Sequence, residues 1–161
     1  MANALNLQQM LVNGLEGKGS HVPHAHALED LDWRLAGVVP QGVTHSIWQL
    51  LQHMIYWQKF SLALLQEKTP HTPEHADETW IEALGPISQA EWQTTVNVFL
   101  EDLQSAKIIA SGDMNHYVQA RPNRTHAEVI SMLAGHNSYH VWQLLRQMLG
   151  IWPPPRGGDT W

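Results

Sequence analysis

The stretch of sequence that decides the fold is THSIWQLLQHMIYWQKFSLALLQE, residues 44–67. Ser46 and Gln49 have the spacing of a capping box, in which each side chain bonds a free backbone N–H at the start of a helix. Prolines follow within a few residues of its end and stop a helix there. The sequence therefore predicts a long helix that begins near Thr44 or Ser46 and continues to about residue 67.

One face of this helix is apolar except for a single histidine. The stripe consists of Leu50, His53, Trp57, Phe60 and Leu64. Positions spaced by three and four residues lie on one face of an α-helix. We therefore expect the stripe to face the core and His53 to point into it.

The rest of the chain gives further helices in the same way. Ser88 with Glu91, and Thr125 with Glu128, repeat the capping pattern. We expect long helices over residues 2–15, 88–110 and 125–150, and a short one over 25–35 in the first long connection. No alternating pattern of a β-strand is found, so we predict an all-α fold.

The composition limits the number of domains and the classes of function. We expect one domain over residues 1–152 and a Pro/Gly-rich tail over 153–161, because 161 residues fit a single core. The net charge of −6 and the thin scatter of nine Lys and Arg argue against nucleic acid as a partner. The absence of cysteine excludes disulfides and thiolate ligands. With no secretory signal and no bilayer-spanning run, we expect a cytoplasmic protein without a membrane partner.

Because cysteine is absent, a soft-metal site would have to use the eleven histidines. His136 and His140 are four residues apart, which places them about 40° apart on one helix face. Two imidazoles at this spacing can share one ion. Neighbouring positions on that face, among them Val129, Met132 and Leu133, are apolar. We therefore expect both rings to point into the core.

Burying His53, His136 and His140 costs free energy unless something binds their ring nitrogens, and a divalent cation does so. Three neutral imidazoles with an open fourth position are typical of catalytic zinc sites, whereas structural sites close all four positions. From the residues alone the alternative stays open that each is a core histidine bonded to a backbone carbonyl.

Two motifs carry a family resemblance: HSIWQLLQHMIYWQ, which contains His53, and HNSYHVWQLLRQMLGIWPPP, residues 136–155. Together with the leader over residues 19–48, they resemble the DinB/YfiT-like superfamily of metal-dependent proteins. The resemblance implies an up-down four-helix bundle, usually a homodimer, with a metal at one end of the core. By motif position the three ligands fall on His53, His136 and His140.

The resemblance also implies a chemistry. Family members of known activity are transferases and isomerases that use a low-molecular-weight thiol, and hydrolytic relatives are also suggested. We therefore expect a thiol-dependent S-transferase or a hydrolase that acts on a small molecule. The alternative is a non-catalytic metal- or ligand-binding stress-response protein. Zinc or nickel is the preferred ion, iron and manganese stay open, and a low-molecular-weight thiol is the expected cosubstrate.

Six further residues are candidates for the surroundings of the metal or for a substrate pocket: Gln49, Trp57, Tyr139, Gln143, His21 and His45. An amide beside a ligating imidazole can fix its tautomer by accepting the remaining N–H, which favours Gln49 and Gln143. His21 lies in the connection that the resemblance places near the mouth of the site. Packing between helices is the alternative role for the aromatic members. No general base is identified, so no catalytic residue is assigned.

Overall fold

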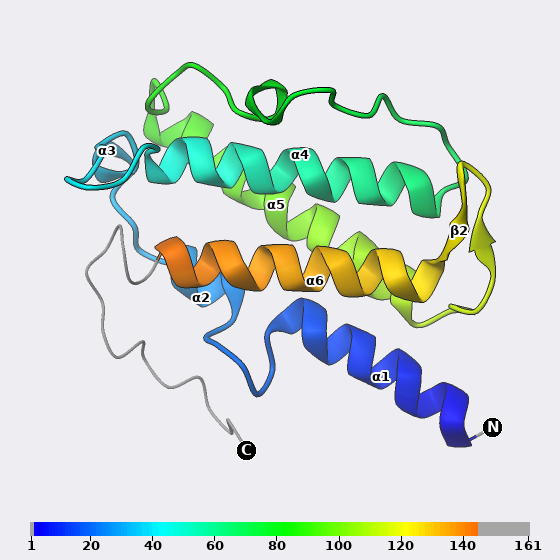
Figure 1. Ribbon diagram of the computed structural model, residues 1–161. Helices are drawn as coiled ribbons and strands as arrows, with labels where there is room; N and C mark the ends of the chain where they lie inside the picture. Colours follow the sequence, from blue (N-terminus) through cyan, green and yellow to red (C-terminus); the bar gives the residue numbers. More distant parts are fainter. Residues whose placement is uncertain (1, 145–161) are drawn as a thin grey trace.

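Four long helices form the body of the protein in the computed structural model, which describes residues 2–144 (Figure 1). They are α1 (Ala2–Glu16), α4 (Ile47–Leu65), α5 (Gln89–Ala110) and α6 (His126–Gln143). Helices α1 and α4 each pack against both α5 and α6. The predicted all-α fold is confirmed, while the expected tail and the end of the fourth helix lie outside the described residues.

Side-chain caps begin three of these helices, at the positions that the sequence predicts. Ser46 and Gln49 form the full capping box of α4, with both hydrogen bonds at 3.1 Å. Thr125 and Glu128 do the same for α6. These bonds satisfy backbone N–H groups that have no partner inside a helix.

The connection between α4 and α5 runs back along α4. In Figure 1 it passes over the top of the bundle, with the short 3-10 helix η1 (Ala76–Thr79) halfway along. The Leu84 carbonyl accepts from Ser46 Oγ, and the Ile81 carbonyl accepts from Gln49 Nε2 at 2.9 Å. Helix α5 therefore begins beside the start of α4. The two run in the same direction, so the order is up-down-down-up rather than a simple alternation.

The predicted helix over 25–35 is wrong in detail, because the structure has two shorter helices there. These are α2 (His24–Leu28) and α3 (Trp33–Ala36). Between them Asp30 takes a positive φ of 55°, which no helix continues through. Leu28 of α2 is buried and Leu35 of α3 is exposed, so the two leucines do not share one buried helix face.

The all-α fold also carries a short hairpin that no alternating sequence pattern indicated. The chain after α5 forms an antiparallel hairpin of β1 (Tyr117–Val118) and β2 (Arg121–Thr125). The sequence of β2, RPNRT, has no alternation of apolar and polar residues, so its pattern could not reveal a strand. The hairpin closes the end of the bundle where α4 ends and α6 begins (Figure 1).

The core has two parts along the bundle axis. One contains Trp48, Leu50 and Phe99, and the other contains Leu15 and Ile130. No helix in the described part of the chain is both long enough and apolar enough to cross a membrane.

His24 is a buried polar residue in the first connection. Neither of its ring nitrogens has a hydrogen-bond partner among the described residues, and the ring packs against His21 and Phe99. Burial, and next the charge of His21, lower the pKa of His24 to about 3. In the folded protein His24 therefore stays neutral at pH values where the same side chain is protonated in the unfolded chain, where its pKa is about 6.5.

We predict that His24 makes the protein less stable in acid. Between pH 6.5 and about 3 the unfolded state binds more protons, so the free energy of unfolding falls as the pH falls through this window. His24→Leu removes this contribution. From pH 7 to 4.5 we expect the wild type to lose about 2–3 kcal/mol more than the variant, measured by urea unfolding. Equal losses would contradict the assignment.

Candidate metal centre

Three imidazoles from two neighbouring helices meet at their Nε2 atoms. His136 Nε2 lies 3.3 Å from His53 Nε2 and 3.1 Å from His140 Nε2. All three potential ligand atoms lie within 4.8 Å of one another. Zinc–imidazole bonds of about 2.0–2.1 Å in a tetrahedral site place two nitrogens about 3.3 Å apart. The spacing therefore fits one ion held by three nitrogens.

The outer nitrogens of two of the rings have hydrogen-bond acceptors. His53 Nδ1 lies 3.0 Å from Thr79 Oγ1 and 3.3 Å from the Thr79 carbonyl oxygen. Thr79 Oγ1 donates its own proton to the Ala76 carbonyl at 2.8 Å, so it can only accept from His53. His140 Nδ1 donates to Gln143 Oε1 at 3.0 Å. Both histidines therefore carry their proton on Nδ1 and present a lone pair on Nε2.

This arrangement leaves one lone pair unsatisfied when all three rings are neutral. His136 Nε2 carries at most one proton, and that proton can be donated to His53 or to His140 but not to both. Buried polar atoms without a partner cost free energy. A cation that accepts all three Nε2 lone pairs removes the conflict, so the donor set matches a divalent metal.

Burial keeps the three rings in the neutral form that binds metal. It is the largest cause that lowers the pKa of His53 and of His136 to about 4, followed in each case by the charge of His140. Burial also lowers the pKa of His140, partly offset by the hydrogen bond to Gln143. At neutral pH the lone pairs are therefore available without loss of protons.

Aromatic rings surround the three-histidine group. The indole of Trp80 stacks on His53 with centroids 3.9 Å apart, and Trp57 meets the edges of His53 and His136 at 6.5 and 6.2 Å. On α6 the group falls between the two parts of the core, rather than at one end of it as the family resemblance implies. The indole rings of Trp57 and Trp80 exclude water from part of the site.

Only some of the six further candidates lie at the group. Trp57 and Gln143 contact its rings, and Tyr139 lies 5.0 Å from His140 with its own ring largely exposed. His45 is half-buried and stacks on Trp80 at 3.8 Å, so it reaches the site through that indole.

Two candidates have their contacts elsewhere. Gln49 serves the α4 capping box and the Ile81 carbonyl. His21 Nε2 lies 2.9 Å from Ser138 Oγ. Because Ser138 projects about 160–200° from the two ligand positions of α6, His21 lies on the other side of that helix.

Thr79 and Trp80 are the site residues that sequence reasoning missed. Both belong to the connection after α4, which brings them beside His53. Thr79 is 26 positions from His53 in the sequence. Neither stands in a helical pattern, so nothing in the local sequence marks them. Only the return of the connection along α4 reveals their role.

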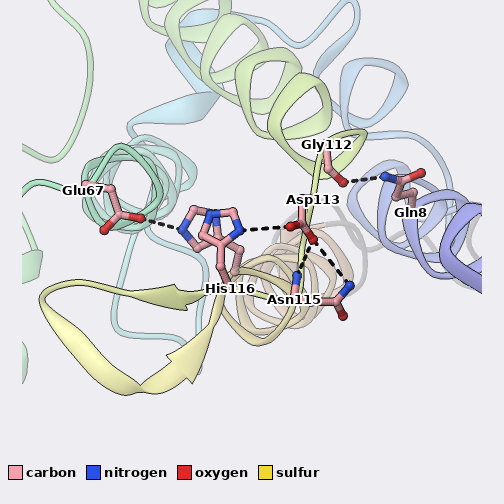
Figure 2. A network of polar contacts seen from close by, with 7 residues as sticks. Gln8, Glu67, Gly112, Asp113, Asn115 and His116 are labelled. Atoms are coloured by element: carbon pink, nitrogen blue, oxygen red, sulfur yellow. Dashed lines mark hydrogen bonds and ion pairs between the residues drawn. The ribbon is translucent and has the colours of Figure 1, made fainter.

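A second group, formed by Glu67, His116 and His126, also has ligand atoms within 4.8 Å of one another. Figure 2 shows Glu67 and His116 within a network of polar contacts near the hairpin. Glu67 is already engaged, because its carboxylate accepts from the Gln119 N–H at 2.8 Å and pairs with His126 Nε2 at 2.9 Å. His126 begins α6, and a helix start favours anions over cations. We interpret this group as a structural contact that joins the end of α4 to the hairpin and to the start of α6.

The protein is therefore an all-α bundle in which three imidazoles meet at a point that could hold a metal ion. A family model for the DinB superfamily matches residues 24–144, and the chain belongs to that superfamily. No curated protein and no solved structure matched the chain.

We predict that His136→Ala abolishes metal retention, because it removes the nitrogen that lies next to both other ligand atoms. The wild type should carry about one divalent ion per chain and the variant close to none, measured by elemental analysis after dialysis. His71→Ala, at an exposed histidine of the connection, is the matched control and should retain the wild-type content. Full occupancy in His136→Ala would rule out the site.

We further predict that Gln143→Leu weakens metal binding without removing it. The substitution leaves His140 in place but deletes the acceptor that fixes its tautomer. Loss of such a partner typically costs 10- to 100-fold in affinity. Competition with a chromophoric chelator measures the change, with Gln93→Leu on exposed α5 surface as control. An unchanged affinity would show that Gln143 does not support the ligand.

Proposed function

We propose that this protein is an enzyme that binds one divalent transition metal through His53, His136 and His140 and acts on a small molecule with a low-molecular-weight thiol as cosubstrate. The observation that carries the proposal is that the Nε2 atoms of His53 and His140 lie 3.3 and 3.1 Å from the Nε2 atom of His136. Two of the three outer nitrogens are bonded in the way that supports ligation. Zinc or nickel is the preferred ion.

The chemistry follows from the charge of the donor set. Three neutral imidazoles leave the full positive charge of a divalent ion uncompensated. When bound, such an ion supplies Lewis acidity and lowers the pKa of a thiol or a water at the remaining position. Trp57 and Trp80 then limit the access of bulk water to that position.

The surroundings favour a thiol over hydrolysis. Within residues 2–144 no carboxylate forms a hydrogen bond or ion pair with any of the three imidazoles. Glu128, the nearest acidic residue before them on α6, is bound in the capping box with Thr125. A metal-bound water still has a pKa of about 7, and a general base usually assists its attack. A thiol starts from a much lower pKa than water, so beside a cation it gives its proton to solvent at neutral pH without a base from the protein.

The missing base also fits the second candidate, a non-catalytic metal- or ligand-binding protein. The two candidates differ in turnover. If the metal-loaded protein consumes both thiol and an electrophile, and His136→Ala does not, the enzyme is supported. Thiol binding without turnover across a panel of electrophiles favours the binding protein. The homodimer and the cytoplasmic location stay predictions.

We predict that a thiol reaches the metal directly. Cobalt(II) loaded into the three-histidine site reports changes in its ligands through its visible absorption. Titration with 2-mercaptoethanol should change the visible bands and add a sulfur-to-metal charge-transfer band. The same concentration of ethanol should change neither. A spectrum that is unchanged at saturating thiol would contradict the thiol-dependent function.

A further inference from the structure

A groove of about 550 Å³ lies beside the three-histidine group and is lined by α4, α6 and the hairpin. His136 is part of its wall, so the groove adjoins the proposed metal position. Helices α4 and α6 run antiparallel, and the hairpin closes the end of the bundle where α4 ends and α6 begins (Figure 1). His53 lies in the first half of α4 and His136 in the second half of α6, away from that end. The groove therefore extends from the metal position towards β2.

The long walls of the groove are apolar. Trp57, Phe60 and Leu64 line it from α4, and Val129 and Met132 line it from α6. Met132 is 60% exposed, although its spacing on α6 predicts a core position. A large flexible apolar side chain that borders a hollow is typical of a surface that a ligand covers.

The hairpin end of the groove is positively charged in a chain whose net charge is −6. Arg121 and Arg124 of β2 both line it. The guanidinium of Arg121 donates to the Ala120 carbonyl at 3.3 Å and to Thr72 Oγ1, and both of these partners are neutral. No carboxylate of the described residues lies in ion-pair range of Arg121, whereas Arg124 has Glu128 at 3.6 Å. The charge of Arg121 is therefore uncompensated.

We propose that this groove binds the substrate, and that the substrate is an amphipathic anion. Its reactive head lies at His136, its apolar body lies along α4 and α6, and its anionic group, such as a carboxylate, pairs with Arg121. From His136 to Val129 the helix rises about 10 Å, which sets the length of the body. Only the placement of the reactive head rests on the proposed function.

Arginine suits this role because its planar guanidinium binds a carboxylate through two parallel hydrogen bonds. Such a pair gains strength beside apolar walls, where water screens it less. Apolar contacts alone would bind a neutral ligand of the same shape as tightly as the anion. The difference in affinity between an anion and its neutral isostere therefore isolates the contribution of Arg121.

The test measures binding of octanoate and of neutral octanamide to metal-free protein by titration calorimetry. We expect octanoate to bind at least fivefold more tightly than octanamide. Arg121→Gln should remove this preference. Arg121→Lys keeps the positive charge but not the two parallel hydrogen bonds of the guanidinium, so it should retain part of the preference. Arg34→Gln, the same change on exposed α3, is the matched control and should leave both affinities unchanged.

Met132→Asp tests the apolar wall independently. Because Met132 is exposed, the protein should fold normally, while a carboxylate within the groove should weaken both ligands and octanoate more strongly. Equal affinity for octanoate and octanamide, or an identical response to Arg121→Gln and Arg34→Gln, would overturn the inference.

The two proposals fail separately. Charge-dependent octanoate binding in a protein that takes up no metal supports the groove and contradicts only the proposed function. Metal uptake with no saturable octanoate binding overturns only the inference.

Discussion

The rest of the site depends on one constraint, that the Nε2 atoms of two buried imidazoles and one half-buried imidazole face one another between α4 and α6. At 3.1 and 3.3 Å from His136, the lone pairs of His53 and His140 need a common partner. A divalent cation would satisfy this need, because it can accept a lone pair from each ring. Thr79 and Gln143 hold the outer nitrogens, so each ring presents the correct atom.

The long connection after α4 is part of this site rather than a passive link. It retraces α4 and delivers Thr79 to His53, with Trp80 covering the ring. Its path is held where Gly37 and Gly85 touch: a Cβ added at Gly85 would lie 2.8 Å from the Gly37 Cα. A larger residue at either position would push the connection away. The close approach of these two glycines therefore helps to fix the path of the connection that carries Thr79 and Trp80.

The sequence predicted the parts of the molecule that depend on local periodicity and capping. The long helices, the boxes at Ser46 and Thr125, and the shared helix face of His136 and His140 belong to this group. The meeting of His53 with that pair was predicted mainly from the family resemblance. The hairpin, Thr79 and the exposure of Met132 could not be predicted, because they follow from how distant segments pack. The sequence RPNRT has no strand pattern, yet as β2 it supplies the arginines of the groove.

X-ray absorption spectroscopy of the zinc-loaded protein tests the central claim most directly, because it counts the ligands of the ion and identifies their type. The account predicts three imidazole nitrogens at about 2.0–2.1 Å and one exchangeable oxygen or nitrogen ligand. Addition of a thiol should replace that ligand with sulfur at about 2.3 Å. A spectrum with one imidazole or none, or with only oxygen ligands, would contradict the three-histidine site.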